Sequence, residues 1–226
     1  MPGYDVRNAQ THDILQIHTE SFLNEIAARG DCIPGWVEAS VCALPFVVIR
    51  RGSIGEDSLP IGVRGTHRNQ RYGTFCSSAS VRQAITPAQL LNCSSPAARL
   101  EAIPALTTLA LLKDRWMSVG LLWGPGGSVG FELATGRNVT SVSSDLDIVI
   151  RAPQYVSIEE ARWLYAQTTD FPAEIDLRAE TRVGGFSLKE YARDERKKIL
   201  LRTACGAILT CDPWQENFVT SEGAQL

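Results

Sequence analysis

The sequence lacks long apolar stretches. None of its uninterrupted apolar runs approaches the ~20 residues that a membrane-spanning helix requires. The first residues, MPGYDVRNAQTHD, also lack the apolar core of a secretory signal peptide. We therefore expect a cytoplasmic protein that has no membrane partner.

Metal-binding patterns of cysteine and histidine are missing as well. The six cysteines never form a CxxC pair, and the chain has three histidines. A structural zinc site takes four such ligands at close spacing, so the sequence argues against one. A chain of 226 residues can bury a substantial core without cross-links. We accordingly expect reduced and mostly buried thiols.

Acidic residues are absent from residue 58 to residue 100, although the whole chain has a formal net charge of −3. The sequence pI of about 5.7 excludes a generally basic nucleic-acid-binding protein. Of the 22 basic residues, four are lysine and the rest are arginine, whose planar guanidinium suits bidentate contact with phosphate or carboxylate. For any single arginine, covering an ordinary surface is the commoner role. The acid-free segment contains Arg64, Arg68, Arg71, Arg82 and Arg99.

Local patterns indicate an α+β fold of two domains. Residues 92–97, Asn-Cys-Ser-Ser-Pro-Ala, are the best linker candidate, and we place the domains at 1–92 and 97–226. Helix-start signals stand at Thr86-Pro87 and at two capping boxes, and Gly30 is expected to end a helix. The capping boxes are residues 157–160 and 187–190. The strands we expect cover residues 45–51, 61–65, 70–75, 119–123, 145–150, 173–179, 199–203 and 207–210.

Two carboxylates are expected on one face of a strand. Asp145 and Asp147 are two residues apart, so on a strand their side chains point the same way while Leu146 points into the core. Like charges so close repel unless a cation lies between them, and Mg²⁺ prefers one or two carboxylates plus phosphate oxygens. Asp176 lies on a later predicted strand as a third acid. This pattern favours a metal-dependent phosphoryl or nucleotidyl transfer.

A glycine turn precedes these acids. Gly126-Gly127-Ser128 lies between a predicted strand and a predicted helix. Glycine lets the backbone approach a ligand, and the free N–H groups at a helix start attract phosphate. We therefore assign Gly127 and Ser128 to the binding of substrate phosphates.

The same turn also satisfies G-x-S-x-G, the nucleophile turn of α/β-hydrolases, over residues 126–130. In that fold the catalytic histidine follows the serine along the chain. His12, His18 and His67 all precede Ser128. The hydrolase interpretation is therefore rejected.

A longer block carries a family resemblance. The stretch W-G-P-G-G-S-V-G-F-E-L-A-T-G over residues 123–136, followed by S-D-L-D over 144–147, resembles the phosphoribosyl-dephospho-CoA transferases. These are the holo-acyl-carrier-protein synthases of malonate decarboxylase, and G-G-S followed by D-L-D is similar to the wider nucleotidyltransferase superfamily. The segments that add to the resemblance are 12–13, 59–65, 68, 70–71, 200–203 and 212–214.

The resemblance implies a fold and a reaction. The C-terminal domain would be a nucleotidyltransferase-like mixed sheet with packed helices, and the N-terminal domain would bind substrate or carrier. A serine of the apo acyl-carrier subunit would attack the α-phosphorus of 2′-(5″-triphosphoribosyl)-3′-dephospho-CoA, and pyrophosphate would leave. The partners implied are this carrier and this nucleotide, with no nucleic acid and no membrane.

The resemblance also implies roles for the residues singled out above. Asp145 and Asp147 would hold Mg²⁺ or Mn²⁺, and Asp176 would act as a base or as a ligand of a second metal ion. The groups expected to bind substrate phosphates are Gly127, Ser128, Arg64, Arg68 and Arg71. Two alternatives stay open: a metal-dependent nucleotidyltransferase with a different hydroxyl acceptor, and a non-catalytic binding module on the same fold.

Overall fold

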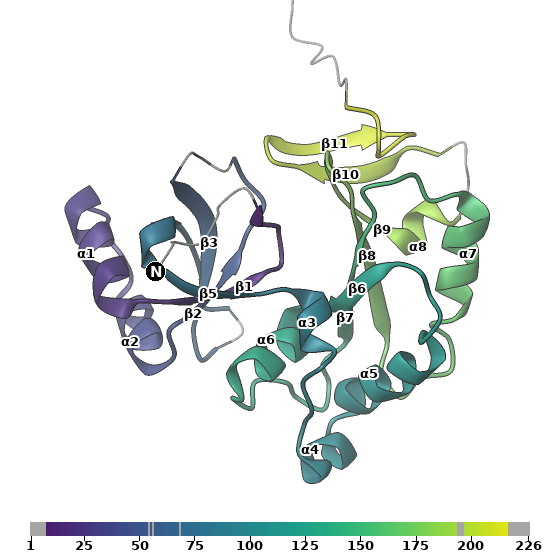
Figure 1. The fold of residues 1–226 in the computed structure, drawn as a ribbon, viewed down its shortest axis with the longest axis horizontal. Helices are drawn as coiled ribbons and strands as arrows, with labels where there is room; N and C mark the ends of the chain where they lie inside the picture. Colours follow the sequence, from purple (N-terminus) through teal and green to yellow (C-terminus); the bar gives the residue numbers. More distant parts are fainter. Residues whose placement is uncertain (1–7, 54, 56, 68, 194–196, 217–226) are drawn as a thin grey trace, which may run out of the picture.

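The computed structural model describes residues 8–53, 55, 57–67, 69–193 and 197–216. These residues form two sheets that follow one another along the chain, each with helices of its own (Figure 1). The predicted α+β class is confirmed. Within the described ranges, no helix combines the length and apolar character needed to cross a bilayer. The domain limits, 1–92 and 97–226, stay a prediction.

The N-terminal sheet is antiparallel at every described pair of neighbouring strands. Its strands, in the order β4-β3-β2-β1-β5, are β1 (Ile14–Ile17), β2 (Phe46–Ile49), β3 (Ser58–Arg64), β4 (Arg71–Ser77) and β5 (Val81–Ile85). The β3–β4 pair is a hairpin around residues 65–70, as the sequence predicts. A short 3₁₀ helix, η2 (Ser78–Ser80), leads into β5.

Two helices cover one face of this sheet. They are α1 (Thr19–Arg29) and α2 (Gly35–Ala43). Gly30 ends α1 with a φ of 69°, and its N–H donates to the carbonyl of Ala27, which confirms the predicted helix end. Phe22 and Val41 are completely buried against the sheet. Packing of these apolar faces gives the N-terminal sheet its own hydrophobic core.

The C-terminal sheet is mixed. Its strands, in the order β11-β10-β9-β8-β7-β6, are β6 (Leu122–Pro125), β7 (Leu146–Arg151), β8 (Ile175–Glu180), β9 (Gly184–Ser187), β10 (Ile199–Thr203) and β11 (Gly206–Thr210). Among the described strands, β7 and β8 form the parallel pair, and α7 (Ile158–Ala166) connects them. The remaining helices are α3 (Pro87–Leu90), α4 (Ala97–Ala102), α5 (Pro104–Arg115), α6 (Gly127–Thr135) and α8 (Leu188–Tyr191).

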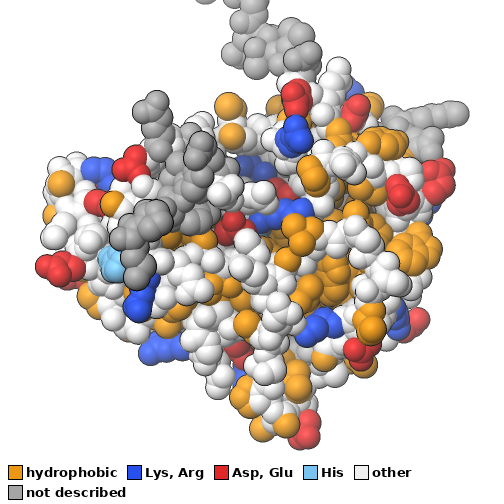
Figure 2. Space-filling model, in the orientation of Figure 1, with side chains coloured by type: hydrophobic (Ala, Val, Ile, Leu, Met, Phe, Trp, Pro, Cys, Tyr) orange, Lys and Arg blue, Asp and Glu red, His pale blue; other side chains and the backbone are white. Residues whose placement is uncertain are grey.

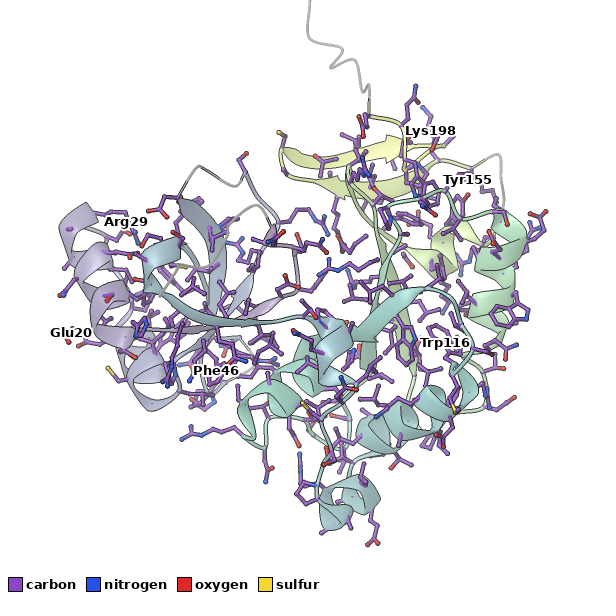
Figure 3. All side chains as sticks on the ribbon, in the orientation of Figure 1. Glu20, Arg29, Phe46, Trp116, Tyr155 and Lys198 are labelled. Carbon is purple, nitrogen blue, oxygen red and sulfur yellow. The ribbon has the colours of Figure 1, made fainter. Side chains whose placement is uncertain are left out.

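Every second residue of β7 has an apolar side chain on the face of the C-terminal sheet that packs against the core helices. Leu146, Ile148 and Ile150 belong to the core that α5 and α7 complete. Trp116, just after α5, packs edge-on against Trp123 of β6, with ring centroids 4.9 Å apart (Figure 3). The intervening β7 residues therefore lie on the opposite face, which is turned toward the N-terminal sheet.

An apolar cluster joins the two sheets. Ile14 of β1, Leu90 of α3 and Phe131 of α6 are each no more than 3% exposed and pack together. α3 begins with the predicted signal, because the Thr86 hydroxyl accepts from the N–H of Gln89 in a complete capping box. The short helix thus fixes the chain where it passes from one sheet to the other.

Buried ion pairs also cross between the two sheets. Arg151 Nη2, at the end of β7, donates to Asp13 Oδ1 at 2.9 Å. Arg51 Nη2 donates to both carboxylate oxygens of Glu180 at 2.7 and 2.8 Å, and His12 Nε2 lies 3.0 Å from the same carboxylate. Both acids are almost fully buried, so each needs its cationic partner.

Several local predictions need correction. Asp145 precedes β7, so the period of a strand does not set its direction. Ser187 makes no side-chain cap, and the four-residue α8 lacks the predicted capping box, whereas Ser157 and Glu160 do form theirs. The strand predicted from residue 119 begins at Leu122. Helix α2 and strands β1 and β5 were not predicted, because their short segments carry no distinct local signal.

The predicted burial of the thiols is wrong. All six cysteines are unpaired, but Cys76 on β4 is the buried one. The others lie at exposed positions because they fall on turns and on outward helix faces: Cys32, Cys42, Cys93, Cys205 and Cys211.

Candidate active site

A cavity of about 510 Å³ lies between the β3–β4 hairpin and the first residues of α6 and β7. Both sheets contribute to its wall, so the fold itself assembles it from distant parts of the chain. We call it the arginine–aspartate pocket. Of the residues predicted to form a site, it is lined by Arg64, Arg71, Gly127, Ser128, Asp145 and Asp147.

Gly127, the first residue of α6, lies directly against the Asp147 side chain. It opens α6 with a φ of 54°, and a Cβ at this position would collide with Oδ2 of Asp147. The N–H of the preceding Gly126 donates to the carbonyl oxygen of Asp147 at 2.9 Å. Only glycine tolerates both the backbone angle and the contact. The glycine turn therefore places the N-terminal N–H groups of α6 beside Asp147.

Two of the three predicted acids lie on adjacent strands, and the third immediately precedes one of them. Asp147 of β7 and Asp176 of β8 stand opposite each other in the parallel register, and Asp145 lies just before β7. Arg178 Nη2 donates to Asp176 Oδ2 at 2.7 Å, and Arg178 Nε lies 4.0 Å from Asp147 Oδ1. Asp176 lies beside the pocket rather than among the residues that line it.

Burial and the negative charge of Asp145 raise the pKa of Asp147. The nearby Asp176 acts in the same direction, whereas Arg178 opposes it. Asp147 is thus a buried carboxylate among like charges that Arg178 does not fully offset.

A divalent cation held here would offset that negative charge. The described residues contain no group of three or more His, Cys, Asp or Glu side chains that could hold a metal ion by themselves. Asp145 and Asp147 nevertheless place two carboxylates in the wall of one pocket. Mg²⁺ is commonly held in this way, with phosphate oxygens of the substrate completing its coordination. The pair fits an ion that arrives with phosphate, not an all-protein cage.

The predicted arginines separate into different environments. Arg64 Nη1 donates to the carbonyl oxygen of Gly127 at 3.2 Å, and its guanidinium lies 5.4 Å from the ring centroid of Phe131. Arg71 faces the same pocket from β4. Arg68 lies outside the described residues. The hairpin from the N-terminal sheet therefore brings positive charge to the aspartates of the C-terminal sheet.

Arg99, from the same acid-free segment, has a structural environment instead. Its Nη2 donates to both carboxylate oxygens of Glu132 at 2.8 Å and to the carbonyl oxygen of Thr140. Glu132 also accepts from the N–H groups of Val139 and Thr140. Burial disfavours the charged carboxylate, but these hydrogen bonds outweigh it and lower the pKa of Glu132. The network holds the loop after α6, which forms part of the pocket wall.

Comparison with known proteins decides the family. Profiles described as the phosphoribosyl-dephospho-CoA transferase MdcG N-terminal and C-terminal domains match residues 10–87 and 89–213. The phosphoribosyl-dephospho-CoA transferase of Pseudomonas putida (strain W619) is 36% identical over 206 residues, which cover 91% of this chain and 95% of the relative. The chain belongs to the phosphoribosyl-dephospho-CoA transferase family.

Other relatives with this name are similarly close. The transferase of Klebsiella pneumoniae (strain 342) is 35% identical over 207 residues, with 90% of this chain and 95% of the relative covered. That of Pseudomonas syringae pv. tomato is 33% identical over 189 residues, with coverages of 84% and 88%. No solved structure gives a significant match. The resemblance expected from the sequence is thus confirmed for the family, and the chain is a transferase by its relatives.

The structure adds residues to the candidate site of this transferase. These residues were not assigned to the site from the sequence. His67, Arg137 and Asn138 line the arginine–aspartate pocket. Arg137 and Asn138 follow Gly136, which ends α6 at a φ of 70°, and a glycine that ends a helix is the local signal that could have located them. Alternation along β8 already puts Arg178 on the face of Asp176, two residues away, whereas its approach to Asp147 depends on the register of β7 and β8.

Proposed function

We propose that this chain transfers phosphoribosyl-dephospho-CoA from 2′-(5″-triphosphoribosyl)-3′-dephospho-CoA to a serine of the apo acyl-carrier subunit of malonate decarboxylase. Pyrophosphate is the second product, and the chemistry is that of a nucleotidyltransferase. Family membership supports the transferred group. The observation that carries the site is one pocket that combines a helix start, arginines and two carboxylates.

In this proposal the pocket holds the triphosphate. The N–H groups at the start of α6, with the Ser128 hydroxyl, bind phosphate oxygens because a helix N-terminus attracts anions. Arg64 and Arg71 approach from the opposite wall and neutralise charge on the leaving phosphates. Asp145 and Asp147 would hold Mg²⁺ or Mn²⁺, which when bound stabilises the charge that develops on the transferring and leaving oxygens.

The transfer itself exchanges one bond to phosphorus for another. The serine Oγ forms a bond to the α-phosphorus, and the bond from that phosphorus to the bridging oxygen of the pyrophosphate breaks. The serine proton passes to Asp176; were Asp176 instead a further metal ligand, the proton would leave to water. Arg178 donates to Asp176 and so fixes the direction of its carboxylate. Positioning and charge stabilisation supply the catalysis.

The proposal predicts that Asp147→Asn abolishes modification of the carrier. Losing a charged ligand of the metal ion removes several kcal/mol of charge stabilisation, so we expect a rate lower by roughly 100-fold or more. The exposed Asp114, on α5 and away from the pocket, provides the matched control Asp114→Asn. Intact-mass measurement of the apo carrier after incubation with the triphosphoribosyl nucleotide is the assay.

The controls separate the remaining interpretations. A chelator should stop the reaction, and added Mg²⁺ should restore it. Full modification by Asp147→Asn would overturn the assigned site. Failure of the wild type to modify this carrier, with pyrophosphate released in the presence of another hydroxyl acceptor, would point to a different nucleotidyltransferase. Absence of any metal-dependent release would favour a non-catalytic module.

A further inference from the structure

The face of β7 that carries Asp147 also carries a cation at its other end. Side chains alternate along a strand, so Asp147, Val149 and Arg151 share one face, and the parallel register places Glu180 of β8 beside Arg151. Four residues of strand correspond to about 13 Å. The proposed reaction centre and Arg151 are thus at opposite ends of one rigid element.

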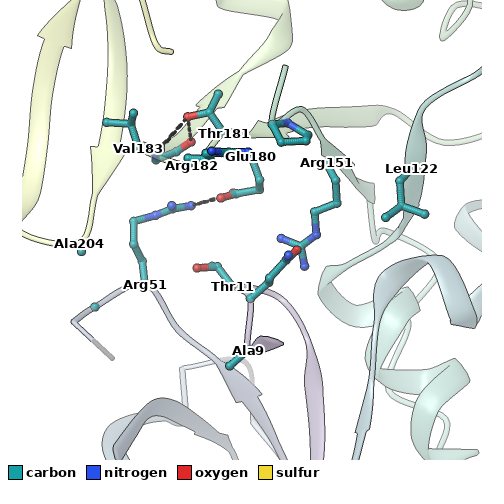
Figure 4. Close-up of a pocket in the computed structure, with 14 residues that line it drawn as sticks. Ala9, Thr11, Arg51, Leu122, Arg151, Glu180, Thr181, Arg182, Val183 and Ala204 are labelled. Carbon is teal, nitrogen blue, oxygen red and sulfur yellow. Dashed lines mark hydrogen bonds and ion pairs between the residues drawn. The ribbon is translucent and has the colours of Figure 1, made fainter. Parts of the chain in front are cut away.

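A second cavity, of about 380 Å³, lies at the Arg151 end (Figure 4). Three arginines and one acid are the charged residues of its wall: Arg51, Arg151, Arg182 and Glu180. Arg51 pairs with Glu180, and Arg151 pairs with Asp13, which lies outside the wall. Arg182 is exposed, and no described residue forms an ion pair with it. The cavity therefore suits an anion.

An apolar cavity of about 730 Å³ continues from this cationic one. The two share Leu122, Arg151 and Pro153. Leu122, Tyr155 and Trp163, all in its wall, are 61%, 67% and 53% exposed. Figure 2 shows apolar side chains gathered on the surface over β6. We call the two connected cavities the β6 groove. Large apolar side chains left uncovered around a hollow mark a binding surface.

We propose that the β6 groove binds the dephospho-CoA half of the substrate, with its diphosphate at Arg151 and Arg182 and its pantetheine arm against Leu122, Tyr155 and Trp163. The inference rests on the proposed function, because it places a substrate whose triphosphate lies in the arginine–aspartate pocket. Two linked riboses separate the triphosphate from the dephospho-CoA diphosphate, and β7 separates the two cationic sites. The order of charge and apolar surface along the groove matches a diphosphate followed by an uncharged arm.

Calorimetric titration with dephospho-CoA tests the cationic end. This probe has no triphosphate and cannot react, so its binding does not depend on catalysis. Arg182→Ala should weaken binding by roughly tenfold, since a charge-assisted hydrogen bond to phosphate contributes about 1.5 kcal/mol. Arg82→Ala is the matched control, because Arg82 is equally exposed on β5 but lines neither cavity. The control should bind dephospho-CoA as the wild type does.

Comparison of dephospho-CoA with ADP tests the apolar end. ADP has the same adenosine diphosphate but no pantetheine arm. Trp163→Ala should weaken dephospho-CoA binding by roughly tenfold, because an apolar contact is lost, and leave ADP binding unchanged. Arg182→Ala should weaken the binding of both ligands. A half-exposed Trp163 on the surface of α7 can be replaced without opening the core.

Three results would overturn the inference. In the first, the wild type binds ADP and dephospho-CoA equally; in the second, both variants bind dephospho-CoA normally. In the third, the variants raise KM for the carrier but not for the nucleotide, which would make the groove a docking surface for the carrier. Failure of the wild type to modify the carrier would instead remove the proposed function, while the dephospho-CoA titration would still report on the groove.

Discussion

At the scale of single residues, Gly127 is constrained both by its backbone conformation and by its surroundings. Its positive φ and its approach to Asp147 are two separate constraints, and the chain offers a residue that has only one of them. Gly136, at the other end of α6, has a φ of 70°, and a Cβ added there would meet no described atom within 4 Å. Substitutions at the two glycines can therefore distinguish the effect of backbone strain from the effect of the collision with Asp147.

We predict that Gly127→Ala and Gly136→Ala lower the free energy of unfolding by about 1 kcal/mol through strain in the left-handed region. Gly127→Ala should lose most transferase activity in addition, because its methyl group must displace the Asp147 carboxylate. Urea denaturation and the carrier mass assay measure the two effects. Equal loss of activity in both variants would show that strain, and not the collision, matters.

At the scale of elements, the loop after α6 depends on a buried ion pair. Glu132 of α6 and Arg99 of α4 have side chains 6% and 21% exposed, and both contact the loop backbone. Removing one member of a buried pair leaves the other charge without compensation. The pair thus links two helices to a wall of the arginine–aspartate pocket.

Arg99→Met should lower the free energy of unfolding by about 3 kcal/mol, since Glu132 would stay buried and charged. Because the loop would lose its anchor, KM for the nucleotide should also rise. Arg82→Met, at an exposed position on β5, should change stability by less than about 0.5 kcal/mol. Comparable unfolding curves for the two variants would contradict the structural role of Arg99.

Helices whose ends have characteristic capping residues could be predicted from the sequence. Elements that depend on packing against distant parts of the chain could not. Glycine readily adopts the left-handed conformation that ends a helix, as Gly30 does. Hydroxyl side chains cap helix starts, as those of Thr86 and Ser157 do. The short β1 and α2 depend on packing against strands far along the chain. Pattern reasoning cannot supply that information, because it considers one window at a time.

The candidate site shows the same division. Asp145 and Asp147 were predicted from their spacing, and Gly127 from its place between a strand and a helix, each within one short window of the sequence. Arg178 approaches Asp147 through the register of β7 and β8, and Arg137 reaches the pocket through the course of a loop. Long-range register and loop paths are properties of the folded chain.

At the scale of the whole molecule, the two sheets meet through buried charges. Burial raises the pKa of Asp13 to about 6, while Arg151 and the N–H of Gln10 hold it below a still higher value. Between about pH 4 and pH 6, the folded chain therefore keeps a proton that the unfolded chain has released. The contribution of Asp13 to stability accordingly falls as the pH rises through this window.

Asp13→Asn should remove that pH dependence. From pH 4 to pH 6, the free energy of unfolding of the wild type should fall relative to that of the variant by an amount on the order of 2 kcal/mol. Urea denaturation of both proteins at several pH values measures the difference. Parallel curves across the window would show that Asp13 titrates normally.

The length of β7 has a consequence for selectivity. Asp147 and Arg151 stand at the two ends of one strand, whose length does not adjust to the ligand. If phosphates bind in the two proposed sites near these ends, the strand would set the spacing between two phosphate groups. ATP, with one polyphosphate, could engage one end at a time. The abundant nucleotides of a cell would then be rejected by their length, with no need to read the base.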